Sequence, residues 1–334
     1  MSKSIPSQPI LQVENLKIYF PIRRGFWGKQ VGEVKAVDDI SFAIEKGKTL
    51  GLVGESGCGK TTTGKGILRV YQPTSGRIYY KGTDIAEMSK AQIRPFRRQL
   101  QLIFQDPYGS LDPRQSVQAI LTEAITTDRQ RHSAAQIKAR IEELLQAVEL
   151  DLSMSDRYPH EMSGGQRQRV GIARALACDP ELIVCDEPVS ALDVSIQAQI
   201  INLLKKLQHS RGLTYLFVAH DLTVVYHIAD VIAVMYLGKI VELMDAKDIY
   251  ANPLHPYTKA LLSAVPITDY AVERQRKRII LKGEVPSPIN APAGCPFHPR
   301  CRFATETCQQ AMPKLTAVGG GHQVACHNLK QVTD

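Results

Sequence analysis

No stretch of the 334-residue sequence approaches the roughly 20 consecutive apolar residues that a membrane-spanning helix requires. Residues 1–6 also lack the apolar core of a secretory signal peptide. No internal repeat or low-complexity tract is evident. With 44% hydrophobic and 22% charged residues, the composition is typical of a globular protein. These features predict a cytoplasmic chain that reaches a membrane only by docking to other subunits.

A concentrated basic tract is also missing, although the formal net charge is +8. The basic residues are scattered, apart from short clusters at residues 23–24, 97–98 and 274–278. Such scattering is typical of a solvated surface, whereas a nucleic-acid site gathers its positive charge on one face. We therefore expect no nucleic-acid partner.

A disulfide framework is not expected from the seven cysteines of a cytoplasmic chain. Three of them are scattered, and four crowd the C-terminal tail. The four are Cys295, Cys301, Cys308 and Cys326. Four thiolates on short loops can surround one soft metal centre, but their spacing is not that of a common zinc finger.

Alternating apolar and polar residues predict an antiparallel pair of strands near the start of the chain. The first strand covers residues 10–20, a basic loop covers residues 23–32, and the second strand covers residues 36–44. The apolar run at residues 49–53 predicts a buried parallel strand. A glycine-rich loop follows it, and then a helix from about Lys60.

The pattern turns helical from about residue 89 to residue 161, which predicts an inserted helical subdomain. Two further buried strands are predicted at residues 182–185 and 214–218, and each follows a helix. This alternation predicts βαβ units and a mainly parallel sheet.

The end of the main domain is predicted from two strand-like segments, residues 231–236 and 238–242. Prolines become frequent after them, which marks a separate tail. The predicted organisation is one α/β domain over residues 8–252 and a small tail domain over residues 253–334.

A phosphate-binding pattern, G-x-x-x-x-G-K-[ST], lies between the predicted buried strand and the predicted helix. It consists of Gly54, Glu55, Ser56, Gly57, Cys58, Gly59, Lys60 and Thr61, followed by Thr62. Its glycines allow backbone N–H groups to curl around phosphate oxygens, and the helix N-terminus adds its dipole. We expect Lys60 to reach the β- and γ-phosphates, Thr61 to bind Mg²⁺, and Thr62 to add a hydroxyl contact.

Acidic residues follow the predicted strand at residues 182–185. A carboxylate at the tip of such a strand is where Mg²⁺ takes its second protein contact. We expect Asp186 to hold the ion and Glu187 to orient and deprotonate the attacking water. His220 ends another strand, where an imidazole can touch the γ-phosphate, and Gln105 can reach both the ion and the water.

A second cradle for phosphate is predicted at residues 162–166, Met-Ser-Gly-Gly-Gln. Ser163, Gly164 and Gly165 open a predicted helix and present backbone N–H groups to an anion. One nucleotide does not need two cradles from the same chain. The arrangement makes sense if each ATP is held between the phosphate loop of one subunit and the Ser163 loop of another.

In order and spacing, these motifs resemble the full motif set of ABC transporter nucleotide-binding domains over about residues 8–250. The set also contains Gln166 and, in this sequence, Ser190, Ala191, Leu192 and Asp193. The resemblance implies a RecA-like core with an antiparallel β-subdomain, an inserted helical subdomain and a head-to-tail ATP sandwich dimer. It also implies that Asp193 acts across the dimer interface, and that Phe20, or alternatively Tyr19, stacks on adenine.

Two further segments, residues 104–114 and 252–258, resemble the oligopeptide/dipeptide and nickel permease family, with the second ATPase subunit as the nearest pattern. This resemblance implies a heterodimer with another ATPase, two transmembrane permease subunits and an extracytoplasmic peptide-binding protein. It places the chain peripherally on the cytoplasmic face of the inner membrane, with the permeases' coupling helices received by residues 89–161.

The cargo stays open, since nickel or another small solute is an alternative to peptides. A non-transport ABC ATPase is a less favoured alternative, because such proteins usually carry two cassettes or coiled-coil inserts.

In the same family, residues 294–301 resemble a segment associated with a [4Fe–4S] cluster. The resemblance implies that Cys295, Cys301, Cys308 and Cys326 hold this cluster. Zinc and unliganded thiols remain alternatives, and the nearby histidines are further candidate zinc ligands. These are His298, His322 and His327.

Overall fold

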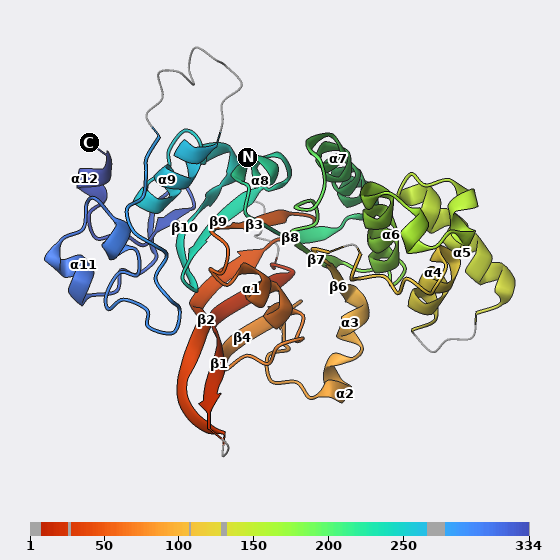
Figure 1. Cartoon of the computed structure of the whole chain (residues 1–334), viewed down its shortest axis with the longest axis horizontal. Coiled ribbons are helices and arrows are strands. Elements are labelled where there is room, and N and C mark those ends of the chain that lie inside the picture. The colour runs from red at the N-terminus through yellow and green to blue at the C-terminus, as the bar shows by residue number, and fades with distance from the viewer. Residues whose placement is uncertain (1–7, 26–27, 107, 128–131, 266–277, 334) are drawn as a thin grey trace, which may run out of the picture. The chain divides into compact units, whose positions relative to one another are not determined.

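The computed structural model describes residues 8–25, 28–106, 108–127, 132–265 and 278–333 (Figure 1). By its internal contacts the chain divides into two units. The first unit comprises residues 1–44, 50–87 and 219–334, and the second comprises residues 45–49 and 88–218.

In the first unit, strand β1 (Leu11–Arg24) pairs antiparallel with both β2 (Lys29–Ile44) and β4 (Ser75–Tyr80). A two-residue strand, β5 (Thr83–Asp84), completes a sheet of order β2-β1-β4-β5. The antiparallel start predicted from the sequence is therefore confirmed, and Figure 1 shows β1 and β2 as a long hairpin.

The predicted loop at residues 23–32 is wrong in its extent. The hairpin ladder continues through the pairs Arg23↔Gln30 and Arg24↔Lys29. These residues are exposed and polar, so they carry no alternation of hydrophobicity. Backbone hydrogen bonds alone extend the strands here, and an analysis of side-chain pattern does not detect them.

The second sheet of this unit has the order β11-β12-β10-β9-β3. Strand β3 (Thr49–Val53) is buried throughout and pairs parallel with β9 (Val231–Tyr236), as a buried parallel strand should. Strand β10 (Lys239–Asp245) is antiparallel to β9 and also pairs with β12 (His322–Val324), which pairs with β11 (Thr316–Gly319). The C-terminal segment thus extends a sheet that begins in the N-terminal half.

Five α-helices and two 3₁₀ turns accompany these sheets among the described residues of the first unit. They are α1 (Lys60–Ile67), α8 (Leu222–Ile228), α9 (Pro256–Ala264), α11 (Glu306–Gln310), α12 (Leu329–Thr333) and the 3₁₀ turn η4 (His298–Arg300), beside a further 3₁₀ turn η3 (Ala246–Asp248). Helix α8 packs closely on β3, since a Cβ at Gly51 would lie 2.1 Å from Cγ1 of Val225.

A buried carboxylate ties the C-terminal segment to the sheet. Glu242 of β10 is fully buried and accepts hydrogen bonds from the backbone N–H of Leu254 (2.6 Å) and of His255 (3.1 Å). Nε2 of His322 on β12 lies 2.9 Å from the same side chain. A buried carboxylate needs such partners, so Glu242 fixes both segments against β10.

The second unit contains three parallel strands in the order β8-β7-β6. They are β6 (Leu100–Ile103), β7 (Leu182–Asp186) and β8 (Thr214–Ala219). Its helices are α2 (Lys90–Ile93), α3 (Phe96–Gln99), α4 (Val117–Thr126), α5 (Ala134–Ala147), α6 (Gly164–Leu176) and α7 (Val194–Arg211), with the 3₁₀ turns η1 (Leu152–Asp156) and η2 (Pro159–Glu161). The predicted parallel βαβ arrangement is confirmed here.

Within residues 89–161, where the sequence pattern indicated helix, the structure also contains the strand β6. This four-residue strand is too short to establish a period by itself. The helices around it begin at sequence signals that the chain does carry. Ser116 caps α4, and Ser133 forms a capping box with Gln136 at the start of α5. Figure 1 shows α4, α5 and α6 grouped together.

A search of the described ranges for a transmembrane helix finds none with the necessary length and apolar character.

Candidate nucleotide site

The loop between β3 and α1 has a backbone conformation that only glycine adopts readily. Gly54, Gly57 and Gly59 have φ angles of 154°, 80° and 108°. Space is as restrictive as conformation at two of them. A Cβ at Gly54 would lie 2.2 Å from the carbonyl oxygen of Met235, and one at Gly59 would lie 2.1 Å from that of Ala36. The glycines of the predicted phosphate loop are thus explained by strain and by close backbone approach.

Lys60 lies at the start of α1 and is only 5% exposed. Its ammonium group donates to the carbonyl oxygens of Gly54 (2.8 Å) and Glu55 (3.0 Å). The loop therefore curls around the lysine, and the charge is held inside the curve. Ser56 is exposed at the turn of this loop, whereas Cys58 is buried, which raises the pKa of its thiol.

The hydroxyl groups that follow Lys60 differ in their surroundings. Thr61 and Thr62 are half-buried. Thr63 is fully buried, and its hydroxyl donates to the carbonyl oxygen of Gly59 (3.0 Å). The third threonine therefore stabilises the first turn of α1.

In the second unit, the structure brings Gln105 and Glu187 together. Nε2 of Gln105, which follows β6, donates to Oε2 of Glu187 at 2.9 Å. Asp186 is buried at the end of β7. Glu187 has a positive φ of 46°, and its N–H donates to the carbonyl oxygen of Val218 at 2.9 Å. Because β6 and β7 are parallel neighbours, their carboxyl ends present these side chains at the same sheet edge.

The loop before α6 is built differently from the loop before α1. Ser163 caps α6, since its hydroxyl accepts from the N–H of Gln166 (3.3 Å) while Oε1 of Gln166 accepts from the N–H of Ser163 (2.9 Å). This reciprocal capping box gives Ser163 and Gln166 a structural role beside the predicted one. A Cβ at Gly165 would lie 2.7 Å from Cγ2 of Ile196 on α7, and one at Gly164 would lie 3.2 Å from Leu192.

Asp193 is an exposed cap of α7. Its carboxylate accepts from the hydroxyl of Ser195 (2.7 Å) and the N–H of Ile196 (3.0 Å). The hydroxyl donor lowers the pKa of Asp193, so the group stays charged. Its exposure leaves it accessible to another molecule.

The remaining predicted residues, His220 and the two aromatic candidates, lie in the first unit. His220 follows β8 and is exposed. Tyr19 donates its hydroxyl to Asp38 at 2.5 Å, and burial with this contact raises its pKa. Phe20 makes an edge contact with Tyr71, with the ring centroids 5.3 Å apart. The hydroxyl of Tyr19 is thus engaged by Asp38, whereas Phe20 contacts the ring of Tyr71.

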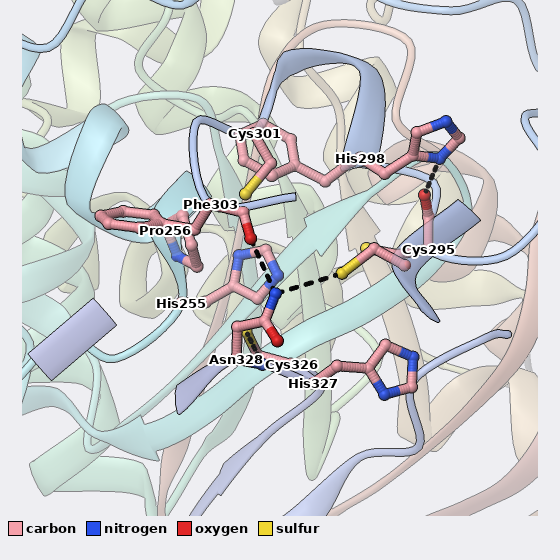
Figure 2. Close-up of a pocket in the computed structure, with 11 residues that line it drawn as sticks. His255, Pro256, Cys295, His298, Cys301, Phe303, Cys326, His327 and Asn328 are labelled. Atoms are coloured by element: carbon pink, nitrogen blue, oxygen red, sulfur yellow. Dashed lines mark hydrogen bonds between the residues drawn. The ribbon is translucent and has the colours of Figure 1, made fainter. Parts of the chain in front are cut away.

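The four C-terminal cysteines line one cavity of about 10 Å³, together with His255, His298, His327 and Asn328 (Figure 2). None of the four forms a disulfide. Asn328 contacts two of them: its Nδ2 donates to Sγ of Cys308 at 3.4 Å, and its N–H donates to Sγ of Cys326 at 3.4 Å. Burial raises the pKa of Cys295 to about 11, and the other three thiols add to the shift.

The predicted metal centre itself is not confirmed. In the part of the chain that the structure describes, no group of three or more His, Cys, Asp or Glu side chains has an arrangement that could hold a metal ion. His322, a suggested zinc ligand, lies against Glu242 instead.

Two residues at the phosphate loop were not predicted from the sequence. Tyr257 and Arg300 of the C-terminal segment both contact Glu55. No local pattern links residues that lie more than 200 positions apart, although Pro256 at the start of α9 and Pro299 in η4 mark the segments that carry them.

Comparison with known proteins identifies the family. The model of the ABC transporter family matches residues 37–190, and the model described as the oligopeptide/dipeptide transporter C-terminal region matches residues 241–308. The chain is 52% identical over 321 residues to the oligopeptide transport ATP-binding protein AppF of Bacillus subtilis, which covers 96% of this chain and 97% of AppF. It is 46% identical to the dipeptide transport ATP-binding protein DppF of Haemophilus influenzae, with 96% and 97% covered.

Among solved structures, the dimeric post-hydrolysis state of the ATP-binding cassette MJ0796, bound to ADP and Pi, is similar with a TM-score of 0.63. It is 27% identical and covers 71% of this chain and 98% of that chain. The ABC ATPase α/β fold, with a mixed sheet and an antiparallel β-subdomain, is thereby confirmed. With near-complete coverage at about half identity, the chain belongs to the ATP-binding subunits of oligopeptide and dipeptide ABC importers, a family of ABC-type ATPases.

Proposed function

We propose that this chain powers peptide uptake by hydrolysing ATP at the cytoplasmic face of the inner membrane, as a peripheral subunit. The observation that carries the proposal is the loop from Gly54 to Gly59, whose positive φ angles curl the backbone around the buried Lys60. Such a curl, followed by a helix N-terminus, is suited to the phosphates of a nucleotide.

The proposed roles follow the chemistry of each side chain. Lys60 binds the β- and γ-phosphates, and Thr61, Gln105 and Asp186 hold magnesium. When bound, that ion neutralises charge on the phosphates. Glu187 is the general base that takes a proton from the attacking water, and the hydrogen bond from Gln105 supports its orientation. His220 contacts the γ-phosphate and positions the water.

We further propose that the active form is a head-to-tail pair of two different ATPase subunits. Ser163 and the helix start behind it bind the nucleotide of the partner subunit, Asp193 contacts the interface, and Phe20 stacks on adenine. Exposure of Ser163 and Asp193 supports this assignment, as does the dimeric state of the similar cassette MJ0796. Two transmembrane permeases and an extracytoplasmic peptide-binding protein complete the proposed importer.

The domain assignment stays as predicted: a RecA-like core within residues 8–252, a helical subdomain over residues 89–161 that receives the permeases' coupling helices, and a Cys-rich tail domain over residues 253–334. The match of a separate C-terminal family model, which covers residues 241–308 and so begins within β10, supports a tail region characteristic of this family.

For that tail we propose a [4Fe–4S] cluster on Cys295, Cys301, Cys308 and Cys326, with zinc as the alternative. The support is the donor set, because four thiols, the usual ligands of such clusters, line one cavity. A bound centre would stabilise a segment with little core of its own. Iron, sulfide and zinc analysis of anaerobically purified protein, repeated on Cys301→Ser, tests this; stoichiometric zinc without iron excludes the cluster.

Glu187→Gln tests the proposed function. Loss of the base lowers kcat by roughly 10²–10⁴-fold. ATP still binds to the variant, and the paired state of two ATPase subunits accumulates. Glu142→Gln, an exposed change on α5, is the matched control and keeps normal turnover. Normal hydrolysis by the Glu187 variant removes that residue from the role, and ATP-loaded protein that never pairs with a second cassette contradicts the composite site.

A further inference from the structure

Glu55, the second residue of the phosphate loop, is held by two side chains from the C-terminal segment. Nη1 and Nη2 of Arg300 donate to Oε2 and Oε1 of Glu55 at 2.7 and 3.1 Å, a bidentate ion pair. The hydroxyl of Tyr257 accepts a hydrogen bond from the N–H of Glu55 at 2.8 Å. The C-terminal segment thus fixes both the side chain and the backbone of this loop residue.

Arg300 is itself fixed in place. Its side chain is only 8% exposed, whereas that of Glu55 is 28% exposed. It ends the 3₁₀ turn η4, where its N–H donates to the carbonyl oxygen of Phe297 at 3.0 Å. The Phe297 ring is buried against Tyr236 and Tyr257, with centroids 5.3 and 5.4 Å away. A bidentate pair whose arginine is buried on such a support has little freedom, which distinguishes it from a fully exposed salt bridge.

The contact reaches the lysine through one peptide group. The carbonyl oxygen of Glu55 is one of the two carbonyl oxygens to which the ammonium of Lys60 donates. Any shift of Glu55 therefore shifts a group that determines where the charge of Lys60 lies. Loss of Arg300 would also leave the Glu55 carboxylate uncompensated in the loop, where it repels the negative charges of a nucleotide.

We propose that Arg300 is a positioning residue for ATP, so that the C-terminal segment completes the phosphate loop of its own chain. The proposal rests on the assignment of residues 54–61 as that loop. Arg300 acts through Glu55 and makes no contact with nucleotide. Its effect belongs to ATP binding, because the groups assigned to the hydrolysis step, Glu187 among them, are unchanged.

The test uses the full-length chain, with kcat and KM for ATP measured beside the Kd of a fluorescent MgATP analogue. Arg300→Ala raises KM and Kd about tenfold, the loss of one charged hydrogen-bonded contact, and leaves kcat within about twofold. Arg300→Lys keeps the positive charge but cannot donate the two parallel hydrogen bonds of a guanidinium group, so it gives an intermediate KM. Arg302→Ala, which removes a nearby arginine that stacks on Phe303, keeps normal binding.

Coupling to Glu55 is measured with Glu55→Gln and the Glu55→Gln/Arg300→Ala double variant. If the two side chains act as one unit, the double variant binds ATP no worse than Arg300→Ala alone. Tyr257→Phe removes the acceptor for the Glu55 N–H and also raises KM. It provides a second measurement if Arg300→Ala does not fold.

Three results overturn the proposal: a normal KM for Arg300→Ala accompanied only by a lower melting temperature, a fall in kcat at unchanged KM, or additive effects of the two single variants. Lys60→Ala separates this proposal from the assignment of the loop. If Lys60→Ala binds nucleotide normally, the loop assignment fails; if it loses binding while Arg300→Ala does not, only the role of Arg300 fails.

Discussion

Two glycine-containing loops, one before α1 and one before α6, use glycine for different physical reasons. In the first, Gly54, Gly57 and Gly59 all have positive φ angles, and two of them touch the backbone of neighbouring strands. In the second, Gly164 and Gly165 are ordinary residues of the first turn of α6, which starts at a capping box. The first loop needs glycine for its backbone conformation, and the second needs it to leave space for the side chains of Leu192 and of Ile196 on α7.

The two loops that we propose to bind phosphate therefore differ in backbone conformation. A curled loop surrounds a phosphate with N–H groups, whereas a capped helix start presents its N–H groups and dipole at an exposed end. The curled loop encloses its own lysine. The helix start contains no cation among residues 162–166, so it suits a phosphate that is already held elsewhere.

Among substitutions in the two loops, Gly59→Ala should have the largest effect. The new methyl group would lie 2.1 Å from the carbonyl oxygen of Ala36, and the alanine would have to adopt a φ of 108°. We therefore expect a loss of about 3 kcal/mol or more in the free energy of unfolding. Gly47→Ala is the matched control, because Gly47 has a φ of 75° with nothing within 4 Å of its Cβ. It should cost about 1 kcal/mol in a denaturant titration. Equal losses would show that the close approach at Gly59 has no energetic consequence.

A second test separates capping from phosphate binding at Ser163. Ser163→Asp keeps an acceptor for the Gln166 N–H and complements the helix dipole, so the free energy of unfolding should stay within about 0.5 kcal/mol. The added charge should weaken ATP-dependent pairing with a second cassette at least about tenfold, measured by gel filtration in the Glu187→Gln background. Ser163→Ala provides the opposite control, since it loses about 1 kcal/mol of stability without adding charge. Normal pairing of the aspartate variant would contradict a phosphate at this position.

The smallest effects are expected within α6 itself. Gly165→Ala brings a methyl group to 2.7 Å from the side chain of Ile196, which can shift, so we expect a loss of about 1 kcal/mol. Gly171 lies in the same helix with nothing within 4 Å of its Cβ. Gly171→Ala should therefore stabilise the protein by about 0.5–1 kcal/mol. Thermal unfolding of the two variants measures the difference, and destabilisation by Gly171→Ala would contradict the free space at that position.

Most of the elements that carry the site could be predicted, because buried strands and helix starts have strong local signals. The apolar run of β3, the glycine loop behind it and the capping residues of α6 and α7 are each contiguous in the sequence. The hairpin beyond residue 22 and strand β6 were missed. The first is held by backbone bonds between polar residues, and the second is too short for periodicity to distinguish it from helix.

The contact between Gln105 and Glu187 depends on two neighbouring parallel strands, of which only β7 was predicted from the sequence. The capping roles of Ser163 and Asp193 have sequence signals, since each precedes a helix by one position. The sequence pattern did not predict that Gly165 leaves space for the side chain of Ile196, because this contact depends on how α6 and α7 pack.

The sequence alone supplied the chemical groups of the proposed site: a lysine in a glycine loop, a carboxylate pair at a strand end, and a capped helix start that we propose binds phosphate. Only the tertiary structure decided what supports that chemistry. Tyr257 and Arg300 reach Glu55 across 202 and 245 positions, and four cysteines meet in one cavity of the C-terminal segment. Local sequence patterns indicate backbone preference and burial. Contacts between residues so far apart in the sequence form only when the sheet and its C-terminal extension pack together.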